Sequence, residues 1–341
     1  MRRALVSLLA LALLVAFAGC GDDDKGKKVV RNDDGIEVTP FTGTTTEMPR
    51  RPIAVTAGED AVWVASMAGG VVSKVDPESG ERIGKPIATD DAPYSIHAAF
   101  GSVWVATFQN DKLVQIDPQT SKVARTTKLD NRPFGLTDGF GSLWVTSVRG
   151  ETVVRVDPKT GRRLARIPID GVPYKIAAGF DHIWVTNIRD DELVKIDPRT
   201  NKVVARYKTG KKPSALVAAG DDIWVAALVG NERAKDGTGT KAQIGNEIRL
   251  GEVWRIDPEN GRRVGNPITV PIRPQAMVGD DTAVWVASLD ADALTRIDTK
   301  TGEAGVPPIG IGNAPTDLAL GFGKVWAPLS REDQLAAQPA N

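Results

Sequence analysis

Tryptophan recurs along this chain at a nearly constant interval. Seven of its eight Trp residues fall at positions 63, 104, 144, 184, 224, 285 and 326. Five of these are followed thirteen residues later by an Asp that comes directly after Val or Ile. Successive Trp residues are 40–41 residues apart, except for one extra stretch of about twenty between Trp224 and Trp285. Such a period means that the chain repeats one small structural unit.

One period contains four short apolar runs separated by turn residues. Residues 173–178, 183–186, 193–196 and 203–207 are rich in β-branched and aromatic side chains, which favour strands. The segment 197–200, Asp-Pro-Arg-Thr, predicts a tight turn, because Asp accepts a local backbone hydrogen bond and Pro presets φ. Each period therefore predicts one four-stranded antiparallel sheet.

Seven such sheets predict an all-β fold, a seven-bladed β-propeller covering residues 36–341. The second strand of each blade is apolar on both faces, so we expect the repeated Trp side chains in the core between blades. The last blade lacks a fourth strand, whereas the segment from Ile36 to Phe41 onward precedes the first blade. We expect that segment to pair with blade seven and to close the ring.

The first twenty residues differ from the rest. A basic start is followed by about fifteen apolar residues and then by Phe17-Ala18-Gly19-Cys20, which is typical of a secretory signal peptide over residues 1–19. The Cys at its end resembles the lipobox of bacterial lipoproteins, in which this residue carries the lipid. That resemblance implies lipid attachment at Cys20, a flexible tether over residues 20–35, and an extracytoplasmic location in the bacterial cell envelope. Plain secretion is the alternative.

The repeat "VWVA…VxxIDPxTxKV" resembles the YVTN and NHL-like propeller repeats of bacterial exported proteins, and more distantly the streptogramin (virginiamycin B) lyase family. The lyase resemblance implies a shared architecture. In that family the repeat often carries Glu after its "WFT" motif, and catalysis uses a His and a metal held by Glu. None of the matching positions here is Glu: they are Ser66, Thr107, Ser147, Asn187, Ala227, Ser288 and Leu329.

A candidate binding site follows from the residues around the Pro that opens the first strand of each blade. Tyr94, Phe134 and Tyr174 directly follow this Pro in three consecutive repeats. Four blades carry a cation directly before it: Arg51, Arg132, Lys212 and Arg273. Aromatic rings beside cations suit a flat or anionic ligand. Asn187 and Arg189 are expected as outer contacts, and the alternative is that the rings only plug the mouth of the ring.

Other features carry less chemistry. His97 and His182 lie on different elements without metal-ligand spacing, so no metal or cofactor is expected. The repeated Asp residues predict turns. The polar, glycine-rich insertion over about 229–248 predicts a decorative loop, a lid or a partner-binding loop.

We expect a non-catalytic binding or interaction module whose partner is a protein, a glycan or a small anionic ligand. The partner would meet the face that carries the loops between the second and third strands. A formal charge of zero gives no reason to expect a nucleic acid. The alternatives are a metal-dependent lyase acting on cyclic peptides or lactones, and a scaffold that binds its partner through the insertion.

Overall fold

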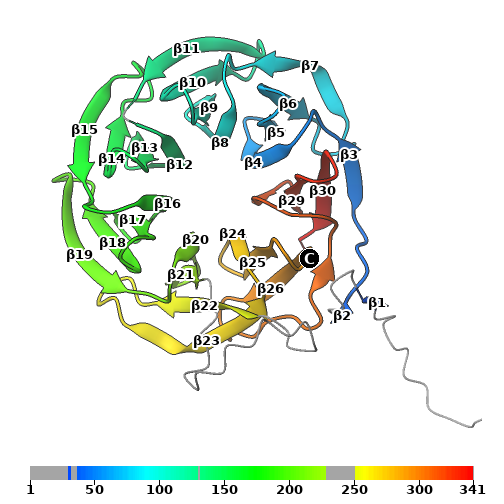
Figure 1. Cartoon of the computed structure of the whole chain (residues 1–341), viewed down its shortest axis with the longest axis vertical. Helices are drawn as coiled ribbons and strands as arrows, with labels where there is room; N and C mark the ends of the chain where they lie inside the picture. The colour runs from blue at the N-terminus through cyan, green and yellow to red at the C-terminus, as the bar shows by residue number, and fades with distance from the viewer. Residues whose placement is uncertain (1–29, 32–36, 130, 228–249, 341) are drawn as a thin grey trace, which may run out of the picture.

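Seven four-stranded antiparallel sheets stand around a central axis in the computed structural model (Figure 1). The structure describes residues 30–31, 37–129, 131–227 and 250–340. The expected seven-bladed propeller is therefore confirmed. The insertion over 229–248 and residues 1–29 lie outside the described residues, as does the tether except for Val30 and Arg31.

Each blade contains four strands from the centre outward. In blades one to six this is also their order in the chain, whereas the outermost strand of blade seven comes from the N-terminal segment. Blades one to four contain β4 (Pro52–Gly58), β5 (Ala61–Ser66), β6 (Val71–Val75) and β7 (Arg82–Ala88); β8 (Pro93–Ala99), β9 (Ser102–Thr107), β10 (Lys112–Asp117) and β11 (Lys122–Lys128); β12 (Pro133–Gly139), β13 (Ser142–Ser147), β14 (Thr152–Val156) and β15 (Arg163–Pro168); β16 (Pro173–Gly179), β17 (His182–Asn187), β18 (Glu192–Asp197) and β19 (Lys202–Lys208).

Blades five to seven follow the same order. They contain β20 (Pro213–Ala219), β21 (Asp222–Ala227), β22 (Leu250–Ile256) and β23 (Arg263–Pro271); β24 (Pro274–Gly279), β25 (Ala283–Ser288), β26 (Ala293–Asp298) and β27 (Ile309–Gly310); β28 (Ala319–Gly321), β29 (Lys324–Leu329), β30 (Gln334–Pro339) and β3 (Thr44–Glu47).

The N-terminal strand β3 closes the ring as the outer strand of blade seven. It pairs antiparallel with β30, with Thr44 opposite Ala337 and Glu47 opposite Gln334. This strand begins later than expected. Upstream of it, β2 (Glu37–Val38) pairs with β1 (Val30–Arg31), and Thr39 forms a parallel bridge with Ile309 of blade six. Residues 30–341 therefore include every described strand of the closed ring.

The repeated Trp residues form the core between blades. The second strand of nearly every blade is buried along its whole length, as expected for a sheet covered on both faces. Trp144 of blade three packs with Ile183 and Val185 of blade four. Its indole Nε1 donates to the carbonyl oxygen of Gly139 at 3.0 Å, and the same bond, five residues back, recurs in five other blades. The Trp side chain thus satisfies its polar atom within its own blade while it fills the space beside the next.

A cation on the Trp ring connects each of four blades to the next one. Lys195, on β18, lies opposite Trp184 of β17, with its ammonium 5.0 Å from the indole centroid. The same ammonium donates to the carbonyl of Pro258 at 2.7 Å. Lys74 reaches Pro118 and Arg155 reaches Pro198 in the same way. Lys324, on β29, lies 5.2 Å from the Trp326 ring and reaches Pro77, which joins blade seven to blade one. These carbonyls belong to the repeated Asp-Pro turns, so the turn also accepts a bond from the preceding blade.

The repeated Asp residues are turn formers, as predicted. The carboxylate of Asp157 accepts the backbone N–H of Lys159 at 2.8 Å and of Thr160 at 3.3 Å. Such bonds lower the pKa of every carboxyl in this series below its ordinary value: Asp76, Asp117, Asp157, Asp197, Asp257 and Asp298.

Removing one Trp should cost a large part of the stability of the ring. We expect Trp184→Ala to lower the free energy of unfolding by about 3–5 kcal/mol, because the cavity left between two blades cannot fill. Urea denaturation followed by far-ultraviolet circular dichroism measures this. Val204→Ala, at an exposed site on β19, is the control and should change little. A loss under about 1 kcal/mol for Trp184→Ala would contradict the inter-blade role.

The turn carboxylates should make the fold sensitive to acid. Each stabilises the folded state above the unfolded pKa of about 3.9, and the contribution is lost as the pH falls through the lower folded-state pKa. In Asp157→Asn/Asp197→Asn the turn bonds remain but do not titrate. The urea midpoint of this variant should therefore fall less steeply than that of the wild type below about pH 4. Equal slopes would show that these bonds do not favour the charged form.

Candidate functional site

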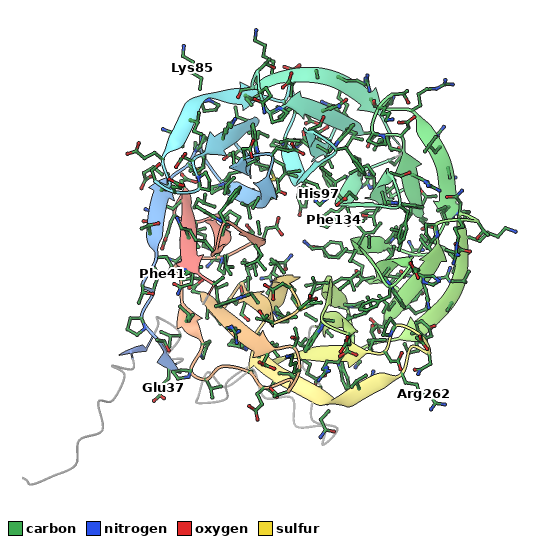
Figure 2. The ribbon with its side chains drawn as sticks, turned by 180° about the vertical axis from the view of Figure 1, so that it is seen from behind. Glu37, Phe41, Lys85, His97, Phe134 and Arg262 are labelled. Atoms are coloured by element: carbon green, nitrogen blue, oxygen red, sulfur yellow. The ribbon has the colours of Figure 1, made fainter. Side chains whose placement is uncertain are left out.

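The innermost strands surround a central cavity with a volume of about 690 Å³. All seven blades contribute lining residues from these strands. Viewed from the side opposite to Figure 1, Phe134 points into the central opening (Figure 2). Because each innermost strand runs in the same direction, equivalent positions form successive rings along the axis.

The first ring carries the predicted aromatic cluster. The Tyr94 and Phe134 ring centroids are 4.8 Å apart, and those of Phe134 and Tyr174 are 4.2 Å apart. Phe108 extends the stack beyond Tyr94 at 5.0 Å. Gln275, from blade six, donates to the hydroxyl of Tyr174 at 3.3 Å. The expected clustering at one arc of the mouth is confirmed, and the result is a continuous aromatic wall.

Burial and the neighbouring Tyr174 raise the pKa of Tyr94, although Arg51 acts in the opposite direction. Its phenol is therefore neutral at physiological pH and can donate a hydrogen bond. The wall thus offers flat apolar faces together with hydroxyl groups.

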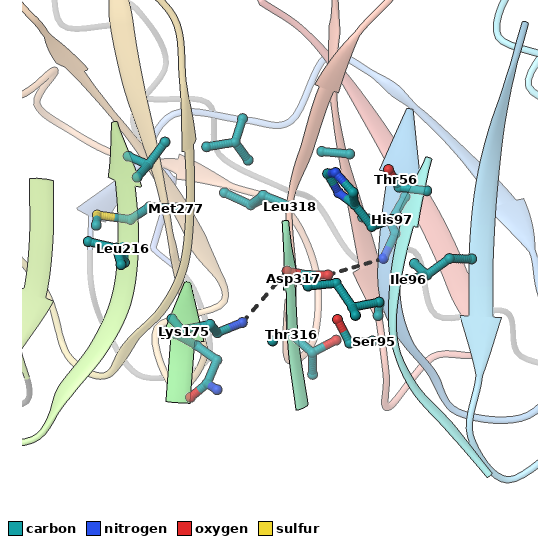
Figure 3. Close-up of a pocket in the computed structure, with 18 of the residues that line it drawn as sticks. Thr56, Ser95, Ile96, His97, Lys175, Leu216, Met277, Thr316, Asp317 and Leu318 are labelled. Carbon is teal, nitrogen blue, oxygen red and sulfur yellow. Dashed lines mark hydrogen bonds and ion pairs between the residues drawn. The ribbon is translucent and has the colours of Figure 1, made fainter. Parts of the chain in front are cut away.

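The second ring contains an ion pair between blades four and seven. The Lys175 ammonium lies 4.0 Å from Oδ1 of Asp317, and Oδ2 of Asp317 accepts the backbone N–H of Val55 at 3.2 Å (Figure 3). Burial raises the pKa of Asp317, while Lys175 and the backbone donors oppose that rise. Lys175 also lies 6.0 Å from the ring centroids of both Phe134 and Tyr174. The pair forms a polar floor beneath the aromatic wall, and the sequence did not predict it.

An aliphatic collar surrounds the middle of the cavity. Counted from the Pro that opens this part of each blade, the fourth residue is a large aliphatic side chain or Met, and each of them lines the cavity: Val55, Ile96, Leu136, Ile176, Leu216, Met277 and Leu318. The collar separates the aromatic mouth from the far end, where Nε2 of His97 lies 2.8 Å from Oδ1 of Asp138. The hydrogen bond to His97 lowers the pKa of Asp138.

The four predicted cations are placed by a backbone feature of the blade crossings. Arg51, Arg132, Lys212 and Arg273 all have positive φ, between 51° and 59°. The backbone N–H of Arg51 donates to Asp333 of the preceding blade at 2.6 Å. Asp111 and Asp191 bind Arg132 and Lys212 in the same way, at 2.7 Å each. These Asp residues, also missed from the sequence, fix where each innermost strand begins.

The side chains of the four cations diverge. Arg51 and Arg273 line the cavity, and Arg273 also pairs with Asp290 at 3.1 Å. The guanidinium of Arg132 lies over the Phe108 ring at 4.7 Å, behind the aromatic wall. Lys212 does not contribute to the cavity lining.

The two predicted outer contacts lie away from the mouth. The Asn187 side chain is fully buried; it accepts the backbone N–H of Val172 at 2.9 Å and donates to Asp190 at 2.8 Å, so it holds its own loop. Arg189 pairs with Glu151 at 2.7 Å across blades three and four. The structure therefore gives both residues a structural contact and brings neither to the cavity.

Comparison with known proteins supports the architecture. No family model matches the chain, and no curated protein matches it. Virginiamycin B lyase from Staphylococcus aureus superposes with a TM-score of 0.70 at 17% identity, over 88% of this chain and all of the enzyme chain. A catalytically inactive variant of that lyase with quinupristin gives 0.69 at 15% identity, again over 88% of this chain and 100% of the other. Hydrazine synthase from Kuenenia stuttgartiensis gives 0.73 at 14% identity, over 88% of this chain and 98% of the other.

The resemblance to virginiamycin B lyase is thus confirmed for the fold. The positions that the lyase resemblance singles out end the second strand of each blade and are buried here. Ser147, for example, donates to the carbonyl of Asn131 at 2.6 Å. Within the described residues, no group of three or more His, Cys, Asp or Glu side chains is placed to hold a metal ion. The described residues also include no helix with the length and apolar character needed to cross a membrane.

The Lys175–Asp317 pair can be tested by titration. We expect Lys175→Met to raise the pKa of Asp317 further, because a nearby cation favours the charged carboxylate. Carbon-13 NMR of the Asp317 carboxyl measures the change. Lys85→Met, on the outer strand β7, is the control and should leave that pKa unaltered. An unchanged pKa in Lys175→Met would show that the two charges do not interact across the cavity.

Proposed function

We propose that this protein is a lipoprotein of the bacterial cell envelope that binds, without chemical conversion, a compact ligand at the aromatic mouth of the propeller. The observation that carries the proposal is the stack of Tyr94, Phe134 and Tyr174 with Lys175 directly beneath it. The ligand has a flat or ring-shaped apolar part and an anionic group.

The geometry assigns a different role to each layer. A flat group stacks on the Phe134 and Tyr174 rings, where each aromatic contact contributes roughly 0.5–1.5 kcal/mol. Its anionic group reaches the ammonium of Lys175 and the guanidinium of Arg51, which lines the same cavity. The Lys175–Asp317 pair is long at 4.0 Å, so an anion can compete with Asp317 for Lys175. The aliphatic collar below favours retention at the mouth over passage through the ring.

The membrane location rests on the N-terminal sequence. The apolar segment ending at Cys20 supports lipid attachment there, and residues 20–35 would connect the lipid to the propeller. Such an anchor would keep the mouth in the extracytoplasmic space, close to the membrane surface.

The mouth is tested by affinity capture from native envelope extracts. Wild-type protein should retain a ligand that Tyr94→Ala/Phe134→Ala/Tyr174→Ala loses by more than about tenfold, because three stacking faces are removed. Phe322→Ala, an exposed aromatic outside the mouth, is the matched control and should retain the ligand. Matching circular dichroism spectra establish that the triple variant is folded. Equal retention by the wild type and the triple variant would reject the mouth as the site.

The lyase alternative has its own test, which the fold likeness motivates. Protein supplied with Mg²⁺ or Mn²⁺ is incubated with quinupristin, the compound present with the inactive lyase variant. Metal-dependent linearisation of the compound would replace the binding-only proposal. An intact compound after prolonged incubation would agree with it.

A further inference from the structure

Four exposed phenylalanines lie at the hairpin turns on the face opposite the aromatic mouth. Phe100, Phe140, Phe180 and Phe322 each follow an innermost strand and remain 44, 42, 37 and 47% exposed. All four have positive φ, between 51° and 56°. The next residue also has positive φ in each case: Gly101, Gly141, Asp181 and Gly323. These are two-residue turns of the kind that joins adjacent antiparallel strands.

Turn formation does not explain phenylalanine at these positions. Turns with two successive positive φ values favour Asn, Asp or Gly, whereas a bulky side chain is uncommon there. The same turn in blade one has Glu59 and Asp60, and blade five has Gly220. Residues held in unfavourable backbone conformations are concentrated at functional sites. The aromatic rings therefore point to a contact made by this face.

The surrounding surface differs between the two halves of this face. Blade one has an exposed aliphatic residue, Ile83, near the start of its outer strand, and blades two to four have Val123, Leu164 and Val204 at the same place. The same three blades carry exposed cations at or beside the Asp-Pro turns: Lys122, Lys159, Arg162, Arg163, Arg199 and Lys202. Their turn Asp residues are hydrogen-bonded to backbone N–H groups, as described for Asp157.

The other half of the face is acidic. The corresponding turns of blades one and six carry seven acidic residues, against the two cations Arg82 and Lys300: Glu59, Asp60, Glu78, Glu81, Asp280, Asp281 and Glu303. Phe322 of blade seven lies next to blade one and so belongs to this acidic half. Exposed Phe side chains surrounded by cations thus occur on blades two to four, whereas acidic residues outnumber cations at the corresponding turns of blades one and six.

We propose that the surface formed by Phe100, Phe140, Phe180 and their neighbouring cations docks on an anionic lipid bilayer. Aromatic and aliphatic side chains enter the interfacial layer while Lys and Arg contact the headgroups, a combination that gives reversible membrane binding. The acidic half of the face would be repelled by the same lipids. The charge pattern therefore favours one orientation of the propeller, with blades two to four against the bilayer. With this face on the membrane, the aromatic mouth opens away from it.

This inference does not require the lipid at Cys20, although the two agree. Val30 follows Cys20 by ten positions, a length of chain that spans at most about 35 Å. A propeller anchored at Cys20 would therefore remain within reach of the bilayer.

Vesicle flotation with residues 30–341, which contain every described strand of the ring, tests the proposal. The probes are phosphatidylcholine vesicles with and without about 30 mol% phosphatidylglycerol, at about 0.1 M salt. Wild-type protein should float with the anionic vesicles, and binding should weaken at higher salt. Failure to bind either kind of vesicle would overturn the proposal, and so would equal binding to both.

Substitution with Asn separates the surface from the fold. Phe100→Asn/Phe140→Asn/Phe180→Asn should weaken vesicle binding by about tenfold or more, because the inserting side chains are lost. Its melting temperature should stay the same or rise, since Asn suits these turns. Phe322→Asn makes the same change in the acidic half and should bind as the wild type does. Equal vesicle binding by the triple variant would refute the docking surface.

The proposed ligand site at the mouth and the proposed docking surface can be tested independently. The Phe-to-Asn variant should still retain the mouth ligand in the affinity-capture experiment. The Tyr94/Phe134/Tyr174 variant should still float with anionic vesicles. Loss of vesicle binding in that second variant would contradict the assignment of lipid contact to the opposite face.

Discussion

At four of the seven interfaces between blades, a cation lies on the core indole and reaches the next blade, and the ring depends on this interaction. Blades of a propeller do not share backbone hydrogen bonds, so their order and spacing rest on side chains. Lys195 contacts the Trp184 ring and the carbonyl of Pro258 at once, and Lys324 makes the same link from blade seven back to blade one. Burial lowers the pKa of Lys195, whereas the nearby carboxylates of Glu259 and Asp257 act in the opposite direction. The inter-blade contact is thus both apolar and directional.

The fold could be read from the sequence because its strongest signals are local. A Trp every 40–41 residues, turns at Asp-Pro, and strands apolar on both faces each follow from short segments. The clustering of Tyr94, Phe134 and Tyr174 was predictable as well, since consecutive blades place equivalent positions side by side. The start of the closing strand was misjudged because Glu37–Val38 and Thr44–Glu47 both suit strands. In the structure the N-terminal segment first contacts the outer strand of blade six, which is interrupted near Pro307 and Pro308. Thr39 bridges to Ile309 there, before the chain reaches β3.

The floor of the mouth could not be predicted in the same way. Lys175 and Asp317 lie in blades four and seven, and nothing in either local segment indicates the other. Their contact depends on the diameter of the closed ring. The bond from the backbone N–H of Arg51 to Asp333 is similarly a consequence of closure, because Asp333 belongs to the last blade. Sequence patterns therefore identified the residues of the wall, whereas the polar chemistry beneath it required the assembled ring.

Ring closure by β3 and β30 also determines when the final sheet of the propeller can form. The residues that pair there, such as Glu47 and Gln334, are 287 positions apart in the chain. Contacts so distant in sequence form slowly, and until they form β30 has an open edge. A chain interrupted before Gln334 would leave β3 without its partner and the final sheet unfinished. Completion of the final sheet therefore waits until two segments far apart in the sequence meet, and a ring in which they have not met exposes a strand edge to neighbouring molecules.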